Sequence, residues 1–238
     1  MWGDSPLHED ELGEVFASYV EGRIPILPWC ETALAQETSG ISWIGELNRK
    51  GFFTINSQPS VNAIRSDDSV YGWGGGGGRV YQKSYVEFFT RPKYLKLLLE
   101  VITHFPSLTL HAIDFDGVMH SSTQHVGTTA LTWGVFPNKE ILQPTVFNPE
   151  TFAVWSKEAF QLWIEAWAVL YDDETDSCAL IHEVHDTYFL VAIYDNEFVE
   201  NDFYAIFTHV IKMIEDQEKS GDGDDDDNAD VDGGGIEL

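Results

Sequence analysis

The ten-residue block from Val80 to Phe89 most restricts what this chain can fold into, because it is dense in valine, tyrosine and phenylalanine. Residues of these types favour a half-buried, pleated strand. A polar and glycine-rich stretch over residues 60–79, which includes the run Gly74 to Gly78, predicts a loop before the block. Pro92 follows as a good first-turn residue for a helix. The block therefore predicts a strand between a long loop and a helix.

Hydrophobic spacing predicts further elements on both sides of this block. Helices are predicted over residues 9–21, 92–104, 149–171, 177–185 and 203–214, with a short one that follows Ser39 and ends at Gly51. Strands are predicted over residues 52–55, 108–115, 130–136 and 188–194, with Asp116-Gly117 as a hairpin turn. Helices and strands alternate without a regular βαβ repeat. The sequence therefore predicts an α+β fold, a single domain of mixed β-sheets flanked by helices, rather than a doubly wound one.

The charge is strongly acidic and unevenly distributed. The 238 residues include 40 acidic side chains against 13 lysines and arginines, a formal net charge of −27. Residues 215–238 predict a disordered acidic tail after a domain of residues 1–214, and that domain is itself acidic. Nucleic acid and anionic membrane surfaces are excluded as partners, because both need clustered basic residues. A cationic ligand or a basic partner surface fits this field, and so does solubility alone.

Cysteine usage and the chain ends indicate a reducing compartment, which we take to be the cytoplasm. Cys30 and Cys178 have no metal or redox spacing. The N-terminal residues show no signal-peptide pattern, and no apolar run approaches the ~18 residues of a membrane span.

The sequence predicts no catalytic residue and no metal ligand. The glycine run lacks the preceding strand and following helix of a dinucleotide fingerprint, and no Gly-Lys-Ser/Thr completes a P-loop. His182 and His185 have a spacing that can share a metal, but no third ligand of known spacing accompanies them. No G-x-S-x-G elbow is present. An acid–base pair of carboxylates stays open, because so many acids give accidental pairs.

Longer motifs identify a family resemblance. They are Thr54-Ile55-Asn56-Ser57-Gln58-Pro59, Leu131-Thr132-Trp133-Gly134-Val135-Phe136-Pro137 and Gln143-Pro144-Thr145. In this order, and together with the block from Val80 to Phe89, they resemble the C-terminal regulatory domain of eukaryotic methylenetetrahydrofolate reductase. The resemblance runs from about Trp2 to Ile214.

The resemblance implies a ligand sensor rather than a catalyst. The family's regulatory domain binds S-adenosylmethionine or S-adenosylhomocysteine and acts in folate, one-carbon and methionine metabolism. FAD, the NAD(P)H donor and the folate belong to a catalytic (β/α)₈ barrel that this chain does not encode. The resemblance also implies a homodimer, and a reductase barrel as partner in cis or in trans.

Matched residue by residue, the resemblance implies a binding pocket for the regulatory ligand. Its members would be Ala35, Glu37, Thr38, Thr54, Ser57, Thr132 and Thr145. A carboxylate such as Glu37 can stabilise the sulfonium or the ammonium of S-adenosylmethionine, and hydroxyl groups can satisfy its polar edges. A carboxylate near the sulfonium would distinguish the ligand from its demethylated product, whereas one near the ammonium would not. The sequence leaves both arrangements open.

Two other functions compete with the ligand sensor. One is a module that binds no ligand and serves only to dimerise or to dock onto a separate reductase subunit. The other is a small methyltransferase, which usually needs a glycine-rich turn between a strand and a helix, and the sequence shows none.

Overall fold

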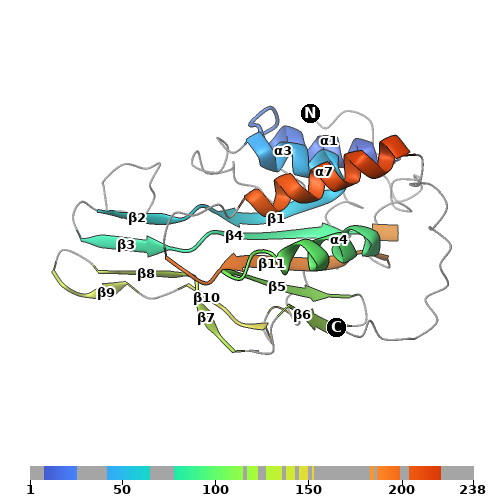
Figure 1. Cartoon of the computed structure of the whole chain (residues 1–238). Helices are drawn as coiled ribbons and strands as arrows, with labels where there is room; N and C mark the ends of the chain where they lie inside the picture. The colour runs from blue at the N-terminus through green and yellow to red at the C-terminus, as the bar shows by residue number, and fades with distance from the viewer. Residues whose placement is uncertain are drawn as a thin grey trace.

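The structure is a computed structural model that describes residues 8–25, 42–64, 78–114, 117–122, 127–135, 138–142, 145–149, 152, 183–184, 187–198 and 204–220. Within these ranges, helices and antiparallel sheets combine into the predicted α+β fold (Figure 1). No helix in the described ranges is both long and apolar enough to cross a membrane.

A five-stranded antiparallel sheet forms the centre of the fold. Its order is β1 (Phe52–Gln58), β4 (Tyr85–Thr90), β11 (Phe189–Asp195), β5 (Leu108–Ile113) and β6 (Met119–Ser121). Every residue of β4 and β5 is buried, which explains why these strands carry apolar residues on both faces. Gly117 of the predicted hairpin turn lies between β5 and β6 with a φ of +81°, while Asp116 lies outside the described residues.

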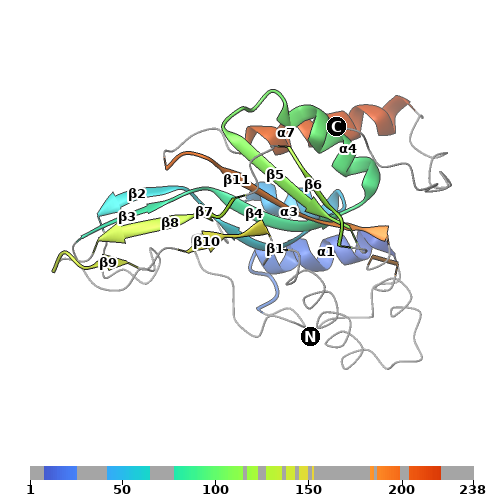
Figure 2. The same cartoon turned by 90° about the horizontal axis from the view of Figure 1, so that it is seen from below.

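Helices cover both faces of this sheet. Figure 2 shows α4 (Pro92–Ile102) and α7 (Ala205–Ser220) on one side and α1 (Glu9–Val20) on the other. The α4–α7 core and the α1 core are separate clusters of buried apolar side chains. The first includes Phe52, Val86, Phe88, Leu98, Val191 and Phe207, and the second includes Leu12, Phe16, Phe53, Phe89, Leu190 and Tyr194. Successive residues of each strand point to opposite faces and so enter the two cores in turn.

The helix α3 (Ser42–Arg49) packs beside β1, the open edge of the sheet, and contributes to both cores. The side chain of Asn48 is fully buried there, and its Oδ1 accepts a hydrogen bond of 2.8 Å from the backbone N–H of Thr54. Its Nδ2 donates to the Thr54 hydroxyl at 2.8 Å and to the carbonyl of Ile44 at 2.8 Å. Asn48 thus satisfies a backbone donor that no neighbouring strand can reach.

A second, four-stranded sheet extends away from the helices as an arm (Figure 1). Its order is β2 (Val61–Ile64), β3 (Arg79–Gln82), β8 (Thr132–Val135) and β9 (Ile141–Leu142). A short ribbon pairs β7 (Thr129–Ala130) with β10 (Val146–Phe147). The strand β10 belongs to the segment that lies over the central sheet.

Several predicted boundaries differ from the structure. The strand predicted over residues 80–89 is two strands, because β3 pairs with β2 and β8 in the arm, whereas β4 pairs with β1 and β11 in the central sheet. Residues 61–64, predicted as loop, form β2 because they pair with β3. The strand predicted over residues 130–136 divides into β7 and β8, which belong to different sheets. Most of the helices predicted over residues 149–171 and 177–185 lies outside the described residues.

The predicted start of the acidic tail at residue 215 is wrong for its first six residues. The helix α7 continues to Ser220, although its apolar repeat ends at Ile214. Lys50 forms an ion pair of 2.9 Å with Glu218, and Lys219 approaches Glu215 to 3.9 Å one helical turn away. Such surface pairs and good helix-forming residues extend a helix beyond its buried face. Residues 221–238 lie outside the described part of the chain.

Candidate functional site

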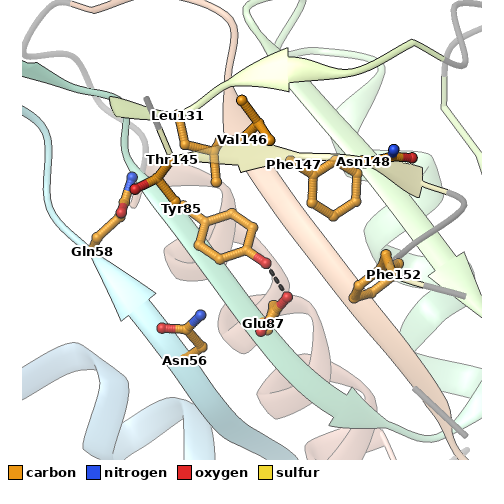
Figure 3. Close-up of a pocket in the computed structure, with 10 residues that line it drawn as sticks. All are labelled: Asn56, Gln58, Tyr85, Glu87, Leu131, Thr145, Val146, Phe147, Asn148 and Phe152. Carbon is orange, nitrogen blue, oxygen red and sulfur yellow. Dashed lines mark hydrogen bonds between the residues drawn. The ribbon is translucent and has the colours of Figure 1, made fainter. Parts of the chain in front are cut away.

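A cavity of about 330 Å³ lies between the central sheet and the segment around β10 (Figure 3). Four side chains from β1 and β4 form its polar floor, and mostly apolar side chains form the opposite wall. The lining residues are Asn56, Gln58, Tyr85, Glu87, Leu131, Thr145, Val146, Phe147, Asn148 and Phe152. Small-molecule sites typically measure about 300–1,000 Å³ and combine apolar walls with a few polar groups, as this cavity does.

A β-bulge in β1 decides which side chains reach the floor. The register with β4 shifts between Thr54 and Asn56, so that Ile55 is an extra residue on β1. After the shift, Asn56 lies opposite Glu87, and Gln58 lies opposite Tyr85. A bulge re-aims the residues that follow it, because it interrupts the two-residue alternation of a strand. Asn56 and Gln58 consequently face the cavity.

Glu87 is the acidic residue of the cavity, and its described lining includes no lysine, arginine or histidine. The side chain is buried and accepts a hydrogen bond from the hydroxyl of Tyr85, drawn as a dashed line in Figure 3. Burial raises the pKa of the Glu87 carboxyl above its ordinary value, while hydrogen bonds from Tyr85 and Asn56 act in the opposite direction. Burial and the neighbouring carboxylate raise the pKa of Tyr85 well above its usual value, so the phenol stays a donor. The cavity therefore holds a buried acid with neutral partners.

Aromatic rings form much of the opposite wall. The ring of Phe147 lies 5.1 Å from that of Phe152 and 6.2 Å from that of Tyr85, measured between centroids. Behind the wall, His111 stacks on Phe147 at 5.1 Å, and its Nε2 lies 3.3 Å from the Tyr194 hydroxyl. Burial lowers the pKa of His111 to about 4, so this imidazole is neutral at neutral pH. The wall therefore presents the faces and edges of uncharged rings.

Four of the seven predicted pocket residues lie in the described part of the chain, two of them at or beside the cavity and two on the other face of β1. Thr145 lines the cavity, and its carbonyl accepts hydrogen bonds from the N–H groups of Leu131 (2.8 Å) and Thr132 (3.2 Å). Thr132 is fully buried beside the cavity-lining Leu131, and its hydroxyl has no hydrogen-bond partner among the described residues. A buried hydroxyl without a partner is costly, so a bound ligand is one way to satisfy it.

Thr54 and Ser57 lie on the other face of β1. They stand opposite Phe88 and Val86, both of which belong to the α4–α7 core. The hydroxyl of Thr54 exchanges hydrogen bonds with Asn48, at 2.8 Å and 3.2 Å. The other three predicted residues, Ala35, Glu37 and Thr38, lie outside the described residues.

Sequence reasoning missed Asn56, Gln58, Tyr85 and Glu87 as cavity residues. One signal was available for Glu87, because a carboxylate between Val86 and Phe88 interrupts an apolar strand. Lys, Glu, Arg and Asp are almost never fully buried unless a partner or a role accounts for them. For Asn56 and Gln58 no signal existed, since the bulge that turns them inward depends on pairing with β4.

A metal site is absent from the part of the chain that the structure describes, where no three histidine, cysteine or acidic side chains gather closely enough to hold an ion. His182 and His185 lie outside those residues.

Comparison with known proteins identifies the class to which this fold and cavity belong. Residues 1–216 match a family model described as "MTHFR, SAM-binding regulatory domain". The chain belongs to this family, the regulatory domains of methylenetetrahydrofolate reductase.

Named relatives agree with that assignment. The chain is 43% identical over 200 residues to methylenetetrahydrofolate reductase (NADH) 1 of Zea mays, covering 83% of this chain and 34% of the relative. It is 39% identical over 198 residues to methylenetetrahydrofolate reductase 1 of Schizosaccharomyces pombe, covering 83% and 32%. It is 38% identical over 214 residues to a probable methylenetetrahydrofolate reductase (NADPH) of Caenorhabditis elegans, again covering 83% and 32%. The chain thus spans about a third of the length of these relatives.

Proposed function

We propose that this chain binds S-adenosylmethionine in the cavity between β1, β4 and the segment around β10. The observation that carries the proposal is a cavity of about 330 Å³ with one buried acid and no basic residue in its described lining. Such a site favours a cationic metabolite over an anionic one. The family to which the chain belongs is named for the same ligand.

We propose that the seven residues implied by the resemblance form the pocket, and that they contribute to it in three different ways. Thr145 contacts the ligand from the cavity wall, and Thr132 uses its unpartnered hydroxyl. Thr54 and Ser57 act through the backbone of β1, because their side chains point to the other face. Ala35, Glu37 and Thr38 complete the pocket from the segment before α3. S-adenosylhomocysteine binds in the same place.

The wider role is regulatory. Occupancy of the cavity shifts an attached or separate reductase barrel between two states, because the ligand binds one state more tightly. The chain itself carries out no reduction and acts as a homodimer in the cytoplasm. The competing proposal, a docking module without a ligand, predicts the same dimer with an unresponsive cavity.

Thermal melting with and without S-adenosylmethionine tests the proposal. Ligand at about 100 times its Kd stabilises a protein by about 2.7 kcal/mol. For a chain of this size, that corresponds to a Tm increase of about 5–10 °C. The absence of both a Tm shift and a saturable heat at millimolar ligand would leave the docking module as the better explanation.

A pair of threonine variants locates the site. Thr145→Val removes a hydroxyl from the cavity wall, and we expect it to weaken binding by about fivefold, the equivalent of one hydrogen bond. Thr103→Val is the matched control, because Thr103 lies at the end of α4 on the opposite face of the sheet, and its hydroxyl donates to the carbonyl of Glu100, one helical turn away, at 2.7 Å. Equal affinities of the two variants would place the ligand elsewhere.

A further inference from the structure

We propose that Glu87, together with the rings of Tyr85, Phe147 and Phe152, recognises the sulfonium of S-adenosylmethionine and so separates this ligand from S-adenosylhomocysteine. This inference rests on the proposed function of the cavity and names the group within it that reads the ligand's charge. Glu87 lies in the middle of β4, outside the residues that the family resemblance places in the pocket.

The position of Glu87 is costly unless a ligand uses it. Its side chain lies on the face of the sheet that carries the cavity, where the residues opposite it are Asn56 on β1 and Ala192 on β11. Tyr85 and Asn56 bond to the carboxyl, but both are neutral, so they would leave the charge of an ionised Glu87 uncompensated. A buried charge without an opposite charge costs several kcal/mol in general. A cation in the cavity would remove this cost.

The aromatic wall of the cavity suits a sulfonium better than an ammonium. An ammonium has three N–H donors that all need acceptors. A sulfonium has none, and its charge interacts with any nearby negative group or ring face. The rings of Phe147 and Phe152 are 5.1 Å apart and offer no acceptor, and Tyr85 approaches the same wall (Figure 3). Aromatic rings around a methylated cation are an established mode of recognition.

Ionisation of Glu87 should accompany binding. Because burial raises the pKa of this carboxyl, the empty cavity shifts its equilibrium toward the protonated form, and an adjacent cation shifts it back toward the ionised form. Among the residues that the structure describes, the other ionisable groups that face this region are Tyr85, His111 and Tyr194. Tyr85 stays protonated because its pKa is raised, and His111 stays neutral because its pKa is about 4. At a pH where Glu87 is partly protonated, binding of S-adenosylmethionine therefore releases protons that S-adenosylhomocysteine does not release.

Calorimetric titration of the full chain with both ligands tests this assignment. An opposite charge within reach of a carboxylate shifts its pKa by about 1–3 units, which is a factor of about ten or more in affinity. We expect Glu87→Gln to weaken S-adenosylmethionine by about tenfold or more and S-adenosylhomocysteine by less than about twofold. Glu9→Gln is the matched control, since Glu9 is a half-buried acid that also bonds to a tyrosine, Tyr188, but outside the cavity. It should change neither affinity.

The outcomes are distinguishable. Failure of the wild type to bind either ligand would refute the proposed function itself. Wild-type binding with unchanged affinities in Glu87→Gln would show that Glu87 is only a structural acid. Equal losses for both ligands would assign Glu87 to the ammonium instead. If the variant does not fold, the wild type is titrated with both ligands in buffers of different ionisation heat between about pH 5 and about pH 8, which measures the number of protons released on binding. Equal proton release by the two ligands would overturn the inference.

Discussion

Removal of the Asn48 side chain should destabilise the protein more than the loss of any surface polar group. Asn48 is fully buried between α3 and β1 and bonds to both the backbone N–H and the hydroxyl of Thr54. In Asn48→Ala, the N–H on the open edge of the sheet loses its partner at a cost of about 1–3 kcal/mol, and the buried hydroxyl adds about 1 kcal/mol. We therefore expect the free energy of unfolding to fall by about 2–4 kcal/mol.

Thr54→Val separates the two contributions. This variant loses the hydroxyl but keeps the bond of 2.8 Å from its N–H to Asn48 Oδ1, so it should cost only about 1 kcal/mol. The double variant should cost less than the sum of the two single ones, by about 1 kcal/mol, because Asn48→Ala already strands the hydroxyl.

Urea denaturation followed by circular dichroism measures all four proteins. With an m-value of about 2 kcal/mol per molar urea, in the middle of the usual range, Asn48→Ala should lower the unfolding midpoint by about 1–2 M. A loss below about 1 kcal/mol, or strictly additive effects, would show that water or a shifted α3 replaces Asn48 at the sheet edge.

Two further predictions concern residues at the ends of α1, α3 and α4. Gly51→Ala should cost about 2–3 kcal/mol in urea denaturation, because φ is +84° and the added Cβ would lie 2.8 Å from Glu9 Oε1. Gly22→Ala should cost only about 1 kcal/mol, because Gly22 has a φ of +74° but no atom within 4 Å of the added Cβ. Similar losses in the two variants would refute the steric argument. Arg91→Met removes the cation that pairs with Glu9, so the pKa of this carboxyl, already raised by burial, should rise further. A carboxyl with a raised folded-state pKa binds its proton more tightly in the folded protein, so raising the pH destabilises the fold. The free energy of unfolding of the variant should therefore fall by about 2 kcal/mol near neutral pH and by less in acid. A loss in thermal melts that does not depend on pH would contradict the prediction.

The sequence determined the local elements and the family. The helices α1 and α4 and the strands β5 and β11 lie within two residues of their predicted limits. Apolar periodicity is a property of residues that are close in the sequence, so it can be recognised without knowing which segments pack against them. The motifs from Thr54 to Pro59 and from Leu131 to Pro137 fixed the family for the same reason, because they are contiguous.

Only the tertiary structure decided the site. A strict two-residue alternation would put Thr54 on the same face as Asn56 and Gln58, but the bulge at Ile55 separates them and turns Asn56 and Gln58 to the cavity. Burial of Glu87 likewise depends on β1, β11 and the segment around β10, which are distant in the chain. Register and burial are set by pairing between separate segments, and no local pattern records which segments will meet.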